Sequence, residues 1–194
     1  RKDPDFFRGI VTNSVLSGYS GRLNQEIRIK RGLSYGAAST LDTRRDVGPF
    51  IASAQTKNES GAEVAALLLE EINRLASAPP ADTELTPRKA VLIGNFSRNL
   101  ETVNGLVNQV GVLALYGLGL DEIDRYIANV QAITTGDVAK FARSKLDAET
   151  SNIIIVGNAK AFLPALEKKF KNVEVIPVDQ LDLNTALLRK KQQP

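Results

Sequence analysis

Four residue types that carry much of protein chemistry are absent from this sequence. Its 194 residues include no histidine, no cysteine, no methionine and no tryptophan. Without histidine and cysteine the usual zinc sites cannot be assembled from the chain, and Ser-His-Asp and Cys-His catalysis are excluded. The lack of cysteine also removes disulfides and thiolate chemistry. We therefore expect this chain to hold no metal and to be no self-contained zinc hydrolase.

Long hydrophobic runs and a strong excess of one charge are lacking as well. The longest apolar stretch, Val110–Leu120, is far shorter than the roughly 20 residues that a transmembrane helix needs, so no membrane span is expected. Lysine and arginine together number 25 against 22 for aspartate and glutamate. Because these basic residues are scattered, we expect no nucleic-acid partner. The composition, 43% hydrophobic and 24% charged, is typical of a globular domain.

The spacing of apolar and turn residues predicts an α+β fold. Two strand-like runs, Tyr35–Asp42 and Phe50–Lys57, are joined by a polar loop and predict an antiparallel hairpin. A long helical segment, Thr86–Gly117, contains three glycines inside it and is expected to break or bend. Thr134 and Asp137 have the three-residue spacing of a helix capping box.

Two later runs predict further strands. Residues 152–157, with the sequence NIIIVG, form a continuous apolar run that favours a central strand covered by helices, and residues 173–178 favour a last strand. The whole pattern predicts a mainly antiparallel sheet with helices packed on one face. We expect one domain at residues 1–178 and a polar tail at residues 179–194.

The most informative stretch is a corner with the sequence GRLNQEIRIKRGLSY. Leu23 and Ile27 lie one turn apart on one helical face, and Gly32 can adopt the positive φ that ends a helix. Arg28 therefore falls in the last helical turn and Tyr35 at the first pleat of a strand. This arrangement brings a guanidinium and a phenol to one side of a tight corner, which suits the binding of a polar chain.

The same residues also have a purely structural interpretation. The positive charge of Arg28 interacts favourably with the helix dipole at the C-terminal end of its helix. Tyr35 is an aromatic residue of the kind that is enriched in β-strands. Glu26 and Lys30 have the spacing of a helical ion pair worth a few tenths of a kcal/mol. From the residues alone, both interpretations of the corner stay open.

The segment SGYSGRLNQEIRIKRGLSYG, residues 17–36, resembles the start of the second, non-zinc domain of the pitrilysin/insulinase family of zinc metallopeptidases, which includes proteins of the mitochondrial-processing-peptidase kind. The zinc-bearing domain of that family carries an inverted H-x-x-E-H motif. In the family an arginine and a tyrosine seven positions later reach towards the active site of the other domain, and Arg28 and Tyr35 have this spacing.

The resemblance implies a metallopeptidase-like two-layer domain that binds substrate for an active site whose zinc is held elsewhere. Its implied partners are an H-x-x-E-H domain or subunit, fused to it or assembled as a homodimer or heterodimer, and an unstructured peptide substrate. Tyr35 would then donate to the oxyanion and Arg28 would hold a nearby substrate carbonyl. By comparison with the family, the chain is expected to be a piece of a longer protein and to lack a strand that precedes Arg1.

A second function remains compatible with the same resemblance. A relative can keep this fold and serve as an inactive structural or scaffold subunit, because fold does not determine activity. The presence of both Arg28 and Tyr35 favours the peptidase, since a scaffold has no chemical need for the pair. Bacterial proteins of the resembled family are often exported, to the periplasm or beyond it, but no signal peptide can be read from this sequence, which leaves the compartment open.

Overall fold

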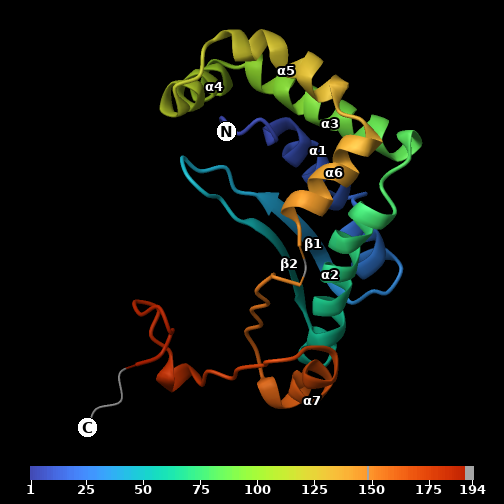
Figure 1. Ribbon diagram of the computed structural model, residues 1–194, viewed down its shortest axis with the longest axis vertical. Helices are drawn as coiled ribbons and strands as arrows, with labels where there is room; N and C mark the ends of the chain where they lie inside the picture. Colours follow the sequence, from blue (N-terminus) through green and yellow to red (C-terminus); the bar gives the residue numbers. More distant parts are fainter. Residues whose placement is uncertain (148, 191–194) are drawn as a thin grey trace.

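The computed structural model describes residues 1–147 and 149–190. Figure 1 shows a β-hairpin that lies against helices, with α3, α4 and α5 arranged beyond one end of it and α7 at the other. The elements are, in chain order, α1 (Phe6–Leu16), a π-helix η1 (Asn24–Ile29), β1 (Ser34–Leu41), β2 (Phe50–Thr56), a 3₁₀ turn η2 (Asn58–Ser60), α2 (Gly61–Ser77), α3 (Asp82–Leu100), α4 (Val103–Tyr116), α5 (Asp121–Ala132), α6 (Thr135–Lys145), α7 (Ala159–Lys169) and a 3₁₀ turn η3 (Val178–Gln180).

The predicted hairpin is confirmed to within one residue at each strand end. Strands β1 and β2 are antiparallel, and Leu41 lies opposite Phe50 next to the connecting loop. The loop closes where the backbone N–H of Asp42 donates to the carbonyl of Pro49 at 3.0 Å. This agreement follows from local information, because strand propensity and turn residues both act over short stretches of sequence.

Among the described residues, helices pack on one face of the hairpin, and the other face is exposed. The main core lies between this face and helices α1, α2 and α6, and it contains the fully buried residues Val11, Val15, Leu75 and Val138. The side chains of β2 alternate between partly buried and exposed along the strand. The expected two-layer arrangement with helices on one face is therefore present.

The sheet is antiparallel as expected, but in the residues that the structure describes it is much smaller than predicted. These residues form a single sheet with the two strands β1 and β2, and helices dominate the rest. Neither predicted run is a strand. Residues 152–157 are irregular, and residues 173–178 are irregular up to Val178, where a 3₁₀ turn begins. The physical reason is that a β-strand needs a hydrogen-bonding neighbour, and neither run has one here.

The long helical segment is broken as expected, between α3 and α4. The break does not lie at a glycine in mid-helix but at Thr102, whose side chain accepts a hydrogen bond from the backbone of Gly105 and begins the new helix. The capping box of Thr134 and Asp137 is confirmed at the start of α6, with both reciprocal hydrogen bonds present. Capping residues of this kind act locally, so the sequence identifies them well.

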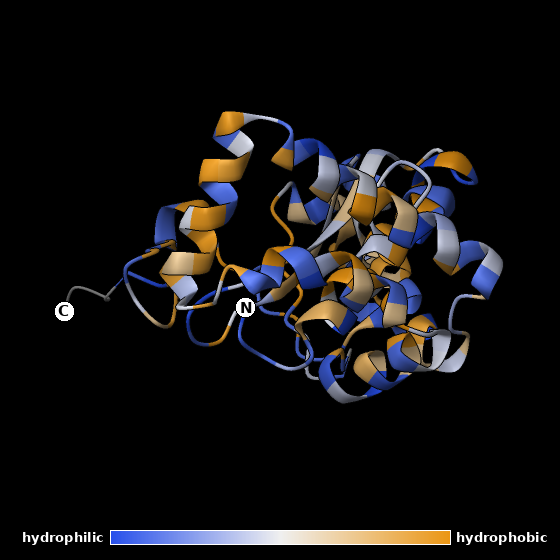
Figure 2. Cartoon of the chain, turned by 90° about the horizontal axis from the view of Figure 1, so that it is seen from above, coloured by the Kyte–Doolittle hydropathy of each residue, from blue (hydrophilic) through white to orange (hydrophobic). Residues whose placement is uncertain are grey.

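Helix α4 exposes much of its apolar surface. Only Leu113 is buried in it, whereas Val103, Val107 and Leu115 are exposed, and the hydropathy colouring of Figure 2 shows apolar residues on the outer helices of the molecule. In the described part of the chain no single helix is long and apolar enough to cross a membrane. Helices α4 and α5 reach that length only as a pair bent by 93°.

The region after α7 is held by polar contacts. Arg189 forms an ion pair with Glu174 at 2.7 Å and lies in an isolated antiparallel bridge opposite Leu181. The expected polar tail at 179–194 is thus folded back on residues just before it, as far as residue 190. Residues 191–194 lie outside the described part.

Candidate functional site

The corner between η1 and β1 is anchored by apolar side chains and turned by glycine. Leu23 and Ile27 are both fully buried, and Gly32 has a φ of +62°, as the sequence predicts. The helix itself differs from the prediction, because it is a π-helix with a hydrogen bond from Lys30 N–H to the Gln25 carbonyl at 3.0 Å. Short π segments are rare and often occur at functional sites.

Tyr35 lies in a β-bulge at the start of β1. The register shifts between Ser34, which is opposite Thr56, and Ala37, which is opposite Ala54, so β1 has one residue more than β2 there. The Ser34 hydroxyl stabilises the bulge by accepting a hydrogen bond from the backbone of Gly36 at 3.1 Å. Bulges of this kind redirect a side chain, and the Tyr35 ring is 91% exposed.

The Arg28 guanidinium lies between two exposed tyrosine rings. Its central carbon is 5.2 Å from the centre of the Tyr35 ring and 5.3 Å from the centre of the Tyr19 ring. Both separations are within the range of cation–π attraction, which is worth about 0.5–1 kcal/mol at exposed sites. The structure therefore brings together Arg28 and Tyr35, the two residues singled out from the sequence.

Tyr19 was not predicted from the sequence. It lies in the Gly18-Tyr19-Ser20-Gly21 turn, nine positions before Arg28, and Gly18 there has a φ of +90°. The available signal was an exposed aromatic residue flanked by turn residues in the same short segment. Helical or strand periodicity could not relate it to Arg28, since the turn between them belongs to neither element.

Three other charged residues of the corner, Glu26, Lys30 and Arg31, are paired with one another. Glu26 forms ion pairs with Lys30 and with Arg31, the latter at 2.6 Å, and Arg74 Nη1 lies 4.0 Å from it. Hydrogen bonds from Lys30 first, and also from Arg31, hold the pKa of Glu26 below its ordinary value. The predicted Glu26–Lys30 pair is thus confirmed.

Arg28 differs from these neighbours. Among residues 1–147 and 149–190, neither its guanidinium nor the Tyr35 hydroxyl has a hydrogen-bond or ion-pair partner. The N–H groups of Arg28 and the O–H group of Tyr35 are therefore free to bind an external acceptor. Since carbonyl and carboxylate oxygens are the acceptors that guanidinium and phenol groups bind, the arrangement suits a peptide backbone.

A buried asparagine fixes the corner. The Asn24 side chain donates to the Gly18 carbonyl at 2.9 Å and accepts from the Ala37 backbone N–H at 2.9 Å. It thereby joins the turn before Tyr19 to the strand that follows Tyr35. Both neighbours of Arg28 are held at fixed positions by this one amide.

The corner is an open surface, and it has no set of metal ligands. Neither of two hollows, of about 1100 Å³ and about 420 Å³, is lined by Arg28 or Tyr35, although Gly18 and Tyr19 line the smaller one. Within the part of the chain that the structure describes, no three His, Cys, Asp or Glu side chains are placed to hold a metal ion. The donor set of this chain therefore does not fit zinc.

Comparison with known proteins shows which kind of domain this chain is similar to. Residues 1–92 match the family model described as the peptidase M16 inactive domain. The chain is also similar to a solved peptidase M16 inactive domain from Pseudomonas fluorescens, with 28% identity and a TM-score of 0.70 over 76% of this chain and 36% of that one. These matches confirm the resemblance to the non-zinc domain of the pitrilysin/insulinase metallopeptidases.

A zinc protease from Streptomyces coelicolor, itself uncharacterized, is 28% identical over 147 residues, which cover 76% of this chain and 32% of that protein. A protease from Helicobacter pylori shares the fold, with 20% identity and a TM-score of 0.60 over 76% of this chain and 36% of that one. The chain thus spans about a third of the length of each of these relatives.

Proposed function

We propose that this chain is the non-zinc half of a zinc-dependent endopeptidase, in which Arg28 and Tyr35 bind the substrate backbone at an active site completed by another domain or subunit. The similarity to the M16 inactive domain and to a zinc protease supports the class of enzyme. The observation that carries the proposal is that Arg28 and Tyr35 lie side by side at an exposed corner, where neither side chain has a hydrogen-bond or ion-pair partner among the described residues.

The open position of the corner supports a shared site. A complete small-molecule or peptide site is normally concave and buries most of its ligand. Here the Tyr35 ring is 91% exposed, and neither Arg28 nor Tyr35 lines the two hollows described above, so the two donors would act on a substrate that another domain or subunit also holds. A zinc-bearing H-x-x-E-H domain facing the corner would provide that second wall, and an extended peptide would lie between the two.

Each residue has one role in this proposal. The Tyr35 hydroxyl donates a hydrogen bond to the oxygen of the scissile carbonyl, where negative charge grows during peptide hydrolysis. The Arg28 guanidinium donates to a neighbouring carbonyl and holds the peptide in register. Activation of water belongs to the metal-bearing partner, and no part of it is assigned to this chain.

The proposal is tested in the assembled enzyme, with a quenched unstructured peptide as substrate. Removal of one oxyanion donor typically lowers kcat by about 10² to 10³, so Tyr35→Phe should lower kcat by this factor while the melting temperature stays unchanged. Arg28→Lys should mainly raise KM, because a lysine keeps the charge but cannot make the planar fork of contacts.

Tyr116→Phe is the matched control. It removes a phenol that donates to the Thr43 carbonyl far from the corner, so it should change stability but leave kcat as it is. Full turnover by Tyr35→Phe would overturn the role of Tyr35. If the assembled protein hydrolyses no peptide even with its natural zinc-bearing partner, the chain is instead a structural subunit, and both substitutions should then leave its assembly intact.

A further inference from the structure

A hollow of about 420 Å³ lies between helices α1 and α3, beside the turn that carries Tyr19. The apolar part of its lining comes from three helices: Phe6 and Ile10 of α1, Val91 and Leu92 of α3, and Tyr126 of α5. Ligand pockets usually have volumes of about 300–1000 Å³. The hollow is therefore large enough for one amino-acid residue.

Two polar atoms in the lining residues are buried and lack a partner. They are Oδ1 of Asn13, on α1, and Nε of Arg88, on α3, and neither has a hydrogen-bond partner in the described part of the chain. Native proteins leave few buried polar atoms in this state, because each one has lost its water without gaining a replacement. The Asn13 oxygen needs a donor and the Arg88 nitrogen needs an acceptor, so the lining is complementary to a ligand that has both.

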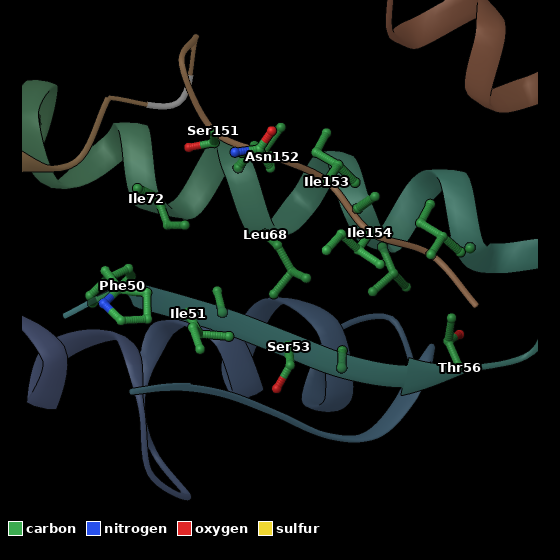
Figure 3. Close-up of a pocket in the computed structure, with 18 of the residues that line it drawn as sticks. Phe50, Ile51, Ser53, Thr56, Leu68, Ile72, Ser151, Asn152, Ile153 and Ile154 are labelled. Atoms are coloured by element: carbon green, nitrogen blue, oxygen red, sulfur yellow. The ribbon is translucent and has the colours of Figure 1, made fainter. Parts of the chain in front are cut away.

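The larger hollow of the molecule has no such pair. It lies between β2, α2 and residues 150–156, and Figure 3 shows Leu68 of α2, with Ile153 and Ile154 of the extended segment, around it. Among the described residues, none of the buried side-chain atoms without a partner belongs to its lining. The smaller hollow is therefore the one whose polar groups indicate a ligand.

No acid compensates the charge of Arg88. Its guanidinium donates to Ser20 Oγ at 2.8 Å and to the Ser20 carbonyl, which are both neutral, and it forms no ion pair among the described residues. Glu84, one helical turn earlier on α3, has both carboxylate oxygens bound to Arg22. Since partly buried charges are normally paired with an opposite charge, the partner that Arg88 lacks is an anion.

The surroundings of the hollow also favour an anion. Three arginines, Arg22, Arg28 and Arg88, lie at or against the turn of residues 18–21, part of which lines the hollow. In the described part of the chain, Glu84 is the one acid that pairs with any of them. The excess of positive charge attracts anionic ligands to this end of the molecule.

We propose that this hollow binds the C-terminal residue of a peptide. The terminal carboxylate binds Arg88, the backbone N–H of the same residue donates to Asn13 Oδ1, and an apolar side chain packs against Ile10 and Val91. A C-terminal residue carries an anion, a hydrogen-bond donor and an apolar group together, and these are the three features that the lining complements. The inference concerns binding alone and holds whether or not Arg28 and Tyr35 take part in hydrolysis.

The position of the hollow favours a peptide over a free small acid. Tyr19 lines the hollow, and its ring is also one of the two beside Arg28. The corner of Arg28 and Tyr35 has free donors that suit a peptide backbone. A peptide whose last residue is held in the hollow can continue past Tyr19 onto this corner, whereas a small acid would use the hollow alone.

The test is fluorescence anisotropy on the full protein that contains these residues, with 1,10-phenanthroline present so that a bound metal cannot support cleavage of the probe. The probe is fluorescein-labelled Gly-Ser-Gly-Ser-Gly-Phe with a free C-terminal carboxylate, and the same peptide with a C-terminal amide is its control. The acid should bind about 10- to 100-fold more tightly than the amide, the factor expected for one hydrogen-bonded charge pair. This comparison needs no variant, so it does not depend on the folding of any substituted protein.

Two unlabelled competitors test the role of the N–H group. N-acetylphenylalanine has the carboxylate, the ring and the N–H, whereas 3-phenylpropionate has only the carboxylate and the ring. N-acetylphenylalanine should displace the probe at a lower concentration, because it alone can donate to Asn13. Equal competition by the two would overturn the assignment of a peptide terminus, since the ligand would then be a small acid.

Three substitutions test the role of Arg88. Arg88→Gln should abolish the preference for the acid and leave the affinity for the amide unchanged. Arg98→Gln is the matched control, because Arg98 is exposed on the same helix and does not line the hollow. Ser20→Ala removes a hydroxyl that Arg88 binds but keeps the charge, so the preference for the acid should remain.

Two further outcomes would overturn the proposal. The first is equal affinity for acid and amide in the unsubstituted protein. The second is a loss of acid preference in Ser20→Ala as large as that in Arg88→Gln, because Arg88 would then act by holding the turn and not by binding the carboxylate.

Discussion

The guanidinium of Arg22 binds the carboxylate of Glu84 with two hydrogen bonds of 2.8 Å each, although the residues are 62 positions apart. A third bond of 2.9 Å runs from Arg22 to the Ala78 carbonyl. This arginine therefore joins the turn before η1 to the start of α3. It supports the corner that carries Arg28 without touching it.

We predict that Arg22→Ala lowers the free energy of unfolding by about 1.5–3 kcal/mol, the range expected when a hydrogen bond to a charged partner is lost from a partly buried site. Arg22→Lys should cost less than Arg22→Ala, because a lysine keeps the charge but not the two-pronged geometry. Urea denaturation measures both effects: the midpoint should fall while the m value stays unchanged.

The control for this prediction is Arg44→Ala. Arg44 pairs with Asp42 in the hairpin loop, where both side chains are well exposed, and such pairs contribute about 0–1 kcal/mol. An Arg22→Ala variant as stable as Arg44→Ala would show that the Arg22–Glu84 pair does not hold the corner.

Tyr19 should position Arg28, and this prediction rests on the proposed function. Tyr19→Ala removes one of the two rings beside the guanidinium, so kcat/KM of the assembled enzyme should fall by about 2–5-fold, the equivalent of one exposed cation–π contact. Tyr19→Phe keeps the ring and should restore the wild-type value. The comparison of the two variants separates ring stacking from any role of the hydroxyl.

A purely structural role for Tyr19 would give a different result. If Tyr19 positions Arg28, the melting temperature of both variants should match that of the wild type, because the ring is 73% exposed. If Tyr19→Ala lowers the melting temperature and Tyr19→Phe lowers it equally, the residue stabilises the turn and does not orient Arg28.

Asp137 should make stability depend on pH in the acid range. Hydrogen bonds from the side chain and backbone of Thr134, and then from Arg8, hold the pKa of Asp137 below its ordinary value of 3.8. A group whose pKa is lower in the folded state stabilises the fold above its unfolded pKa and loses this effect as the pH falls through its folded pKa. The contribution of Asp137 is therefore complete above about pH 4 and disappears below it.

The measurement is the melting temperature of Asp137→Asn and of the wild type from about pH 6 to about pH 2.5. The variant should melt lower at the upper end, and the difference should shrink towards the lower end. Asp46→Asn, in the exposed hairpin loop, should show no such convergence. A difference that stays constant over the whole range would mean that the carboxylate charge of Asp137 does not contribute.

The features that the sequence predicted well depend on a few neighbouring residues. The hairpin, the helix break before α4, the Thr134 capping box and the positive φ of Gly32 all follow from short-range propensities and turn chemistry. The approach of Arg28 to Tyr35 follows in the same way, since the corner between them is short.

The features that were missed depend on partners distant in sequence. The bulge at Tyr35 is visible only in the pairing of β1 with β2, and the π-helix differs from an α-helix by a shift in hydrogen bonding that propensity does not encode. The run NIIIVG was predicted as a strand because apolar runs of that length form strands when a neighbour is present. The run is irregular here because an apolar segment forms a strand only when a neighbouring strand can hydrogen-bond to its backbone.

The two hydrogen bonds of Asn24 have a further consequence for assembly. Because this amide joins the turn before Tyr19 to the strand after Tyr35, the backbone on both sides of Arg28 is already fixed before the second domain of the proposed enzyme would dock. Association then loses little conformational entropy at this corner. Replacing Asn24 would shift that entropic cost to the moment of docking, and it would weaken the complex without removing a single contact across it.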